Sequence, residues 1–80
     1  MFTVYILLNT LMNRHYIGST GDLKRRIIEH NRGQIKSTRF KGEWKLVHQE
    51  DFENKLEVKR RERHMKSYKG GNAFKKLLRW

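Results

Sequence analysis

Apolar and polar positions alternate with two different periods along the chain, and these periods predict its elements. Runs rich in β-branched and aromatic residues are typical of strands, whereas apolar positions three and four residues apart are typical of helices. The pattern predicts strands over residues 2–8, 15–19 and 44–52, and helices over residues 22–32, 54–68 and around 74–78. The first two strands are close enough to form a hairpin, so the chain mixes sheet and helix.

Turn and cap residues set the boundaries of these elements. The Ser-Thr-Gly-Asp stretch at 19–22 offers N-caps for the first helix, and Gly33 is well placed as the residue just after its end. A pair of glycines at 70–71 ends the second helix. Residues 33–43 have no periodicity and carry three basic side chains, so we expect a mobile basic loop there.

The first helix carries two polar residues where its buried side should lie. Leu23 and Ile27 define the apolar stripe, and at about 100° per residue Arg26 and His30 fall within roughly 60° of Leu23. Arg26 could be a snorkelling side chain at the helix edge, and His30 a satisfied core or cap histidine. The other basic residues of this helix fall on its far side, where solvated cations belong: Lys24, Arg25 and Arg32.

The second helix has the same anomaly with the opposite charge. Glu62 shares a stripe with Val58, Met65 and Tyr68, so its carboxylate should point toward the core. A buried carboxylate is costly without a cation, which would be either an arginine or a bound metal ion. Three basic residues of this helix form a separate face that suits phosphate or solvent: Lys59, Arg63 and Lys66.

The hairpin brings two tyrosines together if its turn has an even number of residues. With a turn at 10–13, Leu7 faces Tyr16, and Tyr5 lies diagonally across on the same sheet face. Tyrosines in strands usually pack in the core. The pair is a candidate for a functional site only because a basic helix edge and the Glu62 carboxylate are expected near it.

Length and composition limit the function classes. Eighty residues with no cysteine predict one domain, residues 1–80, held by packing alone, without a disulfide-linked partner and compatible with the cytoplasm. The longest apolar run is too short to span a membrane. Nineteen Lys and Arg against eight Asp and Glu give a net charge of +11, which favours nucleic acid as partner over a solvated face or an anionic membrane surface.

These residues resemble the GIY-YIG endonuclease superfamily, in particular its small stand-alone branch, which is similar to the nuclease domain of the bacterial excision-repair nuclease. The first motif lacks the Gly-Ile-Tyr of the name, so only Tyr5 of Val4-Tyr5-Ile6 carries over. The specific part is Tyr16-Ile17-Gly18 followed by Leu23-x-x-Arg26-x-x-x-His30-Asn31-x-Gly33.

The resemblance implies an α+β fold, a three-stranded antiparallel sheet flanked by helices, and hydrolysis of a phosphodiester with one divalent metal ion, Mg²⁺ or Mn²⁺. By matching position, it implies that Tyr5 and Tyr16 are the motif tyrosines, Arg26 the catalytic arginine, His30 the helix histidine and Glu62 the metal ligand. Asn72 matches a further asparagine near the site, although an N-cap of the last helix explains it equally well.

The residue types suit this chemistry. Arg26 can fork two phosphate oxygens, and one carboxylate can anchor a Mg²⁺ that keeps several waters. A tyrosine acts as base only if cations depress its pKa, and we favour Tyr16 for that role over Tyr5 or His30, which could instead hold the phenol or a phosphate oxygen. We expect DNA as substrate, selected by structure, with Lys36, Arg39 and Lys41 of the loop as further contacts. The alternative is a basic nucleic-acid-binding module without cleavage.

Overall fold

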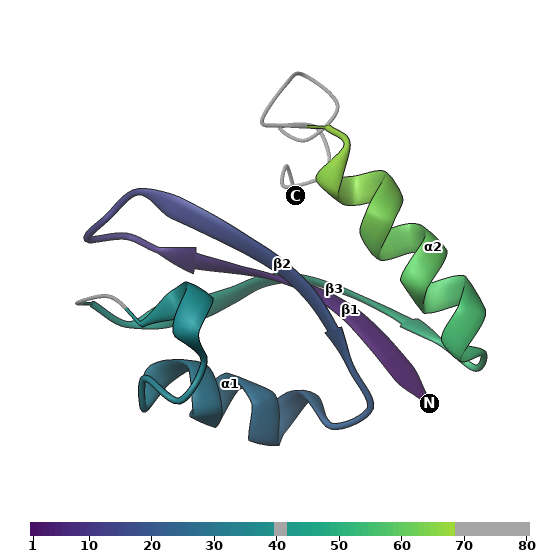
Figure 1. The fold of residues 1–80 in the computed structure, drawn as a ribbon, viewed down its shortest axis with the longest axis horizontal. Coiled ribbons are helices and arrows are strands. Elements are labelled where there is room, and N and C mark those ends of the chain that lie inside the picture. The colour runs from purple at the N-terminus through teal and green to yellow at the C-terminus, as the bar shows by residue number, and fades with distance from the viewer. Residues whose placement is uncertain (40–41, 69–80) are drawn as a thin grey trace.

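A three-stranded antiparallel sheet with the order β2-β1-β3 forms the centre of the fold (Figure 1). The structure is a computed structural model that describes residues 1–39 and 42–68. The strands are β1 (Phe2–Asn9), β2 (Arg14–Thr20) and β3 (Trp44–Phe52), and the helices are α1 (Leu23–Asn31), the short 3₁₀-helix η1 (Lys36–Thr38) and α2 (Lys55–Lys66). The predicted α+β class and antiparallel sheet are therefore confirmed.

The β1–β2 hairpin has the predicted register. Leu7 pairs with Tyr16 and Tyr5 pairs with Gly18, so both tyrosines lie on the same face of the sheet. The four-residue turn between the strands ends at Asn13, whose positive φ of 51° is a conformation that asparagine tolerates better than most residues.

The helices pack on opposite faces of the sheet, because successive residues of β1 point to opposite sides. Val4 and Ile6 form one buried cluster with Val58 and Met65 of α2. On the other face, buried residues pack against Leu23 and Ile27, the predicted apolar stripe of α1; they are Tyr5, Leu7 and Trp44. Among the described helices, none is long and apolar enough to cross a membrane.

Caps explain where α1 and α2 begin and end. The Asp22 side chain accepts a hydrogen bond from the Arg25 backbone N–H, and Asn54 caps α2 in the same manner. After α1, Gly33 has a φ of 73°, its N–H donates to the His30 carbonyl, and the next N–H, of Gln34, donates to the Glu29 carbonyl. This pair of bonds is a Schellman motif, so Gly33 ends the helix as predicted.

The loop after α1 differs from its prediction. It contains η1, and the Trp44 indole N–H donates to the Thr38 carbonyl at 2.9 Å, so the described part of the loop is tied to the core. The absence of periodicity concealed this, because a single helical turn is too short to show one. Lys41, Asn72 and the predicted helix near 74–78 lie outside the described residues.

Candidate functional site

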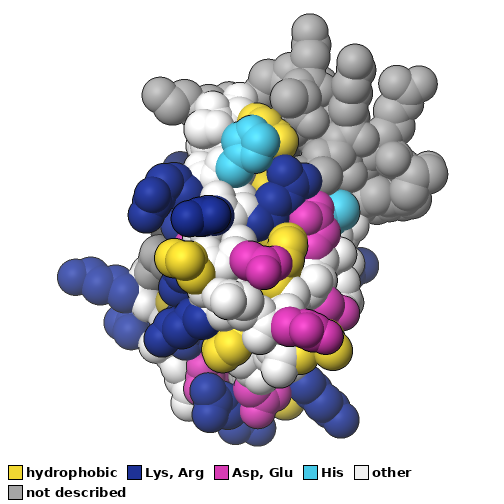
Figure 2. Space-filling model, turned by 90° about the vertical axis from the view of Figure 1, so that its right-hand side faces the viewer, with side chains coloured by type: hydrophobic (Ala, Val, Ile, Leu, Met, Phe, Trp, Pro, Cys, Tyr) yellow, Lys and Arg dark blue, Asp and Glu magenta, His cyan; other side chains and the backbone are white. Residues whose placement is uncertain are grey.

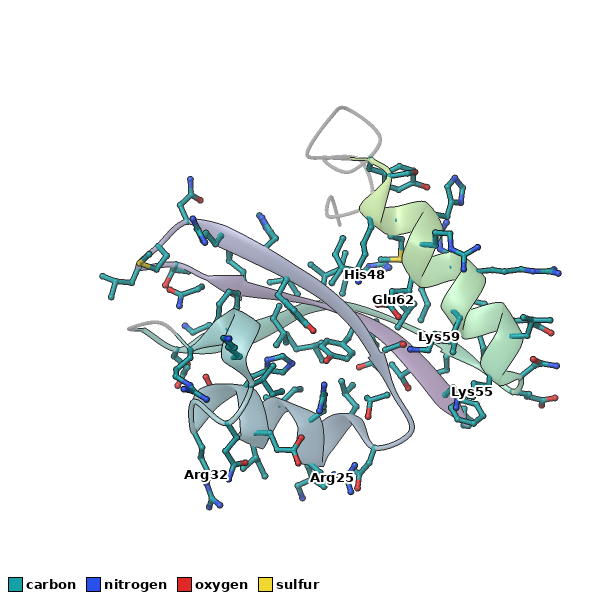
Figure 3. The ribbon with its side chains drawn as sticks, in the orientation of Figure 1. Arg25, Arg32, His48, Lys55, Lys59 and Glu62 are labelled. Atoms are coloured by element: carbon teal, nitrogen blue, oxygen red, sulfur yellow. The ribbon has the colours of Figure 1, made fainter. Side chains whose placement is uncertain are left out.

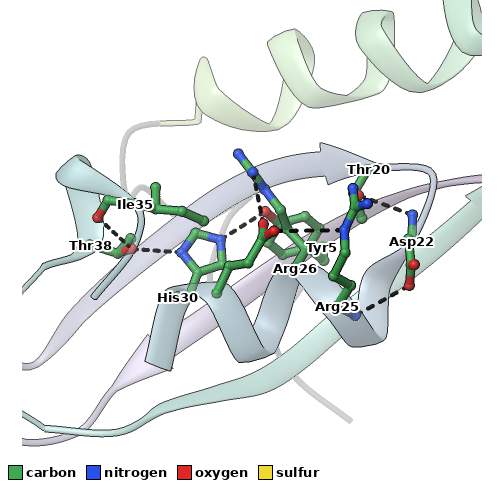
Figure 4. A network of polar contacts seen from close by, with 9 residues as sticks. Tyr5, Thr20, Asp22, Arg25, Arg26, His30, Ile35 and Thr38 are labelled. Atoms are coloured by element: carbon green, nitrogen blue, oxygen red, sulfur yellow. Dashed lines mark hydrogen bonds and ion pairs between the residues drawn. The ribbon is translucent and has the colours of Figure 1, made fainter. Parts of the chain in front are cut away.

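Tyr5, His30 and Thr38 form a chain of buried polar contacts on the α1 face of the sheet (Figure 4). The Tyr5 hydroxyl lies 2.9 Å from His30 Nε2, and His30 Nδ1 lies 2.6 Å from Thr38 Oγ1. All three side chains are essentially inaccessible to solvent. The chain therefore links β1, α1 and η1 through side chains that solvent does not reach.

Burial controls the ionisation of this chain. It raises the pKa of Tyr5 to about 12, although the neighbouring Arg26 guanidinium opposes the rise. Burial, together with the Arg26 charge, lowers the pKa of His30 to about 4. At neutral pH the phenol is therefore protonated and the imidazole is neutral.

Arg26 stands at the edge of this cluster. Its side chain is 36% exposed and pairs with Glu29 at 3.2 Å, while its interaction with the Tyr5 hydroxyl raises its own pKa further. Arg25 and Arg32 point away from the sheet on the outer side of α1, as predicted (Figure 3). Arg26 is thus a cation that is fixed beside the phenol and still reaches solvent.

Tyr16 contributes a half-buried aromatic surface to the same cluster. Its ring centroid lies 4.7 Å from that of His30 and 6.2 Å from that of Tyr5. The structure thus brings four of the predicted site residues together on one sheet face: Tyr5, Tyr16, Arg26 and His30.

Glu62 approaches from α2, on the other face of the sheet. As predicted, it lies on the helix side that faces the sheet, with only 15% of its side chain exposed (Figure 3). Its carboxylate accepts a hydrogen bond of 2.5 Å from the Ser19 hydroxyl and pairs with Lys66 at 2.8 Å and Lys59 at 3.6 Å. Although burial would raise the pKa of Glu62, the bonds from Lys66 and Ser19 outweigh it and keep the pKa below its usual value.

Lys59, Arg63 and Lys66 are exposed and lie together on α2, as predicted, but the prediction that their face is separate from Glu62 is wrong. They line a cavity of about 270 Å³ together with Glu62, and both lysines reach back to its carboxylate. The two cations that satisfy Glu62 are therefore lysines of its own helix. On this side of the molecule, basic side chains gather mainly along one edge and acidic ones along the other (Figure 2).

The oxygen atoms around Glu62 are of the kind that binds a hydrated Mg²⁺ ion. Such an ion takes oxygen ligands and keeps several waters, so one carboxylate beside a cavity can anchor it. The Ser19 hydroxyl is a second oxygen there, whereas no group of three or more His, Asp or Glu side chains that could hold a metal occurs in the described part of the chain. Lys66 occupies one carboxylate oxygen, so a bound cation would compete with its ammonium group.

Sequence reasoning missed two residues of this region. Thr38 orients His30 from a loop without periodicity, and Ser19 reaches Glu62 across 43 positions of sequence. Asn31, which was noted only as part of a motif, binds both the N–H and the carbonyl of Trp44 through its amide. Ser19 stood out only as part of the N-cap stretch at 19–22, and no signal pointed to Thr38, which lies in the middle of the loop predicted at 33–43.

A family model described as the GIY-YIG catalytic domain matches residues 1–75. The chain belongs to the GIY-YIG family. A solution NMR structure of a UPF0213 protein from Bacillus halodurans is similar, with 35% identity, a TM-score of 0.51, and coverage of 91% of this chain and 90% of that one. The fold and the family expected from the motifs are therefore confirmed.

Curated relatives match a shorter part of this GIY-YIG chain. A UPF0213 protein of Staphylococcus saprophyticus is 41% identical over 54 residues, which is 66% of this chain and 66% of that protein. One of Clostridium perfringens is 48% identical over 52 residues, which is 64% of this chain and 56% of that protein. The matched region thus spans less than two thirds of the length of either relative.

Gly18, the glycine of the second GIY-YIG motif, cannot be replaced by a larger residue without a steric clash in this chain. A Cβ atom on Gly18 would lie 2.7 Å from the Tyr5 hydroxyl oxygen and 2.9 Å from Cε2 of Tyr16. Both distances are shorter than a van der Waals contact. Only glycine leaves room for the two motif tyrosines to pack side by side.

Proposed function

We propose that this GIY-YIG domain is a metal-dependent endonuclease that hydrolyses phosphodiester bonds in DNA. The observation that carries the proposal is the convergence of Arg26 with Tyr5, Tyr16 and His30 on one sheet face, where a partly exposed cation is held by a buried polar chain. Such a preorganised cation stabilises charge that develops on a phosphate in the transition state.

Arg26 would contact the scissile phosphate. Its planar guanidinium can donate two parallel hydrogen bonds to phosphate oxygens, and it remains charged at any physiological pH. Glu29 pairs with the guanidinium at 3.2 Å, so part of the side-chain entropy of Arg26 is lost before a phosphate binds.

The base that accepts a proton from the attacking water is best sought among the exposed groups. Tyr5 is fully buried and its pKa of about 12 keeps it protonated, while His30 is buried with both ring nitrogens engaged. Tyr16 is half-buried and lies in the same aromatic cluster, so we assign it this role.

Glu62 would hold the metal ion, with Ser19 beside it. When bound, a divalent ion stabilises the leaving oxygen and activates water. Burial is the main cause of the high pKa of Tyr5, and the charge of the Glu62 carboxylate adds to it.

The substrate we expect is a DNA structure, as in repair or recombination in the cytoplasm, because contacts of basic side chains with phosphates position the DNA without reading its sequence. Lys36 and Arg39 are exposed beside the cluster in the η1 loop. Lys59 and Lys66, each 54% exposed, supply a second basic area around Glu62. Charge on both sides of the site favours a backbone contact that tolerates any sequence.

The test is a cleavage screen over duplex, flapped and branched DNA with Mg²⁺ or Mn²⁺, run on the wild type and on Glu62→Gln. The wild type should cut at least one substrate, and only with metal. Glu62→Gln should retain the fold and DNA binding but lose cleavage, because the amide has the shape without the charge. Cleavage by Glu62→Gln at the wild-type rate would remove Glu62 from the site.

One observation favours a second candidate, a DNA-binding module without cleavage. Lys66 and Ser19 already occupy both sides of the Glu62 carboxylate, so the protein neutralises this charge without a metal ion. The same screen separates the two: a binding module would retain DNA in a shift assay but leave every substrate intact with both metals.

A further inference from the structure

Thr38 is buried, and both its backbone N–H and its carbonyl are hydrogen-bonded, although it lies in a loop. It is 1% exposed, its backbone N–H donates to the Ile35 carbonyl at 3.1 Å, and its own carbonyl accepts from the Trp44 indole. Its hydroxyl lies 2.6 Å from His30 Nδ1 and 3.4 Å from the Ile35 carbonyl oxygen. The backbone bonds thus aim the hydroxyl at the imidazole before any substrate is present.

The direction of each hydrogen bond follows from what the end groups can do. Within the described residues, the Tyr5 hydroxyl finds no acceptor other than His30 Nε2, and the nearby guanidinium of Arg26 can only donate. The Tyr5 O–H therefore donates to Nε2, which must be unprotonated. A neutral imidazole then carries its proton on Nδ1, and this N–H donates to Thr38. The Thr38 O–H completes the chain by donating to the Ile35 carbonyl.

We propose that Thr38 is a positioning residue that fixes His30 in the Nδ1–H tautomer and so turns the lone pairs of the Tyr5 hydroxyl toward Arg26. Without an acceptor at position 38, the Nδ1 proton would be buried and unpaired, and the Nε2–H tautomer would become competitive. Nε2–H would then point at the Tyr5 oxygen, and it would compete with Arg26 for the same lone pairs. Thr38 would thus act on Arg26 through two intervening side chains.

The consequence for catalysis rests on the proposed nuclease function, but the tautomer itself does not. An arginine that loses one contact beside the scissile phosphate has more orientations to lose on reaching the transition state. The rate of the cleavage step should therefore depend on the hydroxyl at position 38, even though Thr38 does not touch the substrate.

The experiment uses nitrogen-15 NMR of the imidazole rings in the full chain, with the His30 signals assigned by their absence in His30→Gln. Thr38→Val removes the acceptor with little change of shape, and Thr38→Ser retains it. Thr3→Val is the matched control, because Thr3 is also buried and donates its hydroxyl hydrogen bond to Asp51, at 2.7 Å, away from the cluster.

The wild type, Thr38→Ser and Thr3→Val should show the neutral Nδ1–H pattern at His30. Thr38→Val should show Nε2–H or a mixture, together with faster solvent exchange of the Arg26 guanidinium N–H groups. Single-turnover cleavage at saturating protein should fall about tenfold or more in Thr38→Val, because the histidine partner no longer sets the tautomer, and stay within about twofold in the other two.

Two results would overturn the inference. One is an Nε2–H pattern in the wild type, which needs no variant and so does not depend on whether Thr38→Val folds. The other is an unchanged Nδ1–H pattern in folded Thr38→Val. If no protein cleaves DNA but the NMR patterns are as expected, the proposed nuclease function fails and the positioning role of Thr38 stands.

Discussion

A methyl group at position 18 has no space in the folded protein. In Gly18→Ala the new Cβ would meet the Tyr5 hydroxyl oxygen at 2.7 Å and the Tyr16 ring at 2.9 Å. Tyr5 has 0% exposed surface, and His30 fixes its hydroxyl, so that ring has nowhere to go without breaking its hydrogen bond. Tyr16 is half-buried between His30 and Trp44 and can retreat only by giving up these contacts.

The cost follows from these two constraints. Overpacking a filled core costs about 1–3 kcal/mol, and losing a buried hydrogen bond adds about 1 kcal/mol. We therefore expect the free energy of unfolding to fall by about 2–4 kcal/mol. For a domain of this size that is a drop in Tm of roughly 8–30 °C.

Urea unfolding followed by tryptophan fluorescence measures this loss, and Gly21→Ala is the matched control. A Cβ on Gly21 meets nothing closer than the Phe2 ring at 3.8 Å, so that variant should stay within about 0.5 kcal/mol of the wild type. If Gly18→Ala is as stable as Gly21→Ala and retains the His30 NMR pattern, the steric account of the motif glycine is wrong.

Three other expectations concern charge. Arg26→Lys keeps the charge but loses the planar fork, so single-turnover cleavage should fall far more than DNA affinity; equal losses, or a similar effect of Arg25→Lys, would contradict the assignment. Because burial lowers the pKa of His30 to about 4, the unfolded state binds a proton at His30 at a higher pH than the folded state does. The free energy of unfolding should therefore fall by up to about 3 kcal/mol between pH 6.5 and about pH 4. Urea titration should show a smaller fall in His30→Gln. Affinity for duplex DNA should decrease with salt at a log-log slope of about −0.9 per phosphate, less steeply when Lys36 and Arg39 are both neutralised; a salt-independent complex would argue against phosphate contacts.

The hairpin and the first helix could be predicted because their signals are local. The period of two together with an even turn fixes the partner of Leu7, and the period of 3.6 places Arg26 and His30 on one side of α1. Both inferences need only neighbouring residues, and the structure has the pairing of Leu7 with Tyr16 and the burial of His30.

The contacts that orient these side chains could not be predicted from local sequence patterns. Thr38 reaches His30 because Trp44 holds the loop, and this depends on three segments meeting in space. Glu62 and Lys66 are four residues apart, so a helical wheel places them side by side, and their side chains pair. The prediction failed at this point because it grouped Glu62 with the apolar stripe and treated the lysines as a separate face.

The position of β1 in the middle of the sheet has a consequence for folding during synthesis. β1 obtains one neighbour, β2, almost immediately, but the other arrives only with residues 44–52, after α1 and the loop have been made. Until then the apolar run from Val4 to Leu8 keeps an open hydrogen-bonding edge, which is a template for pairing with another chain. A fragment that stops before Trp44 should therefore self-associate, and it should do so less once residues 44–52 are added and β3 closes this edge.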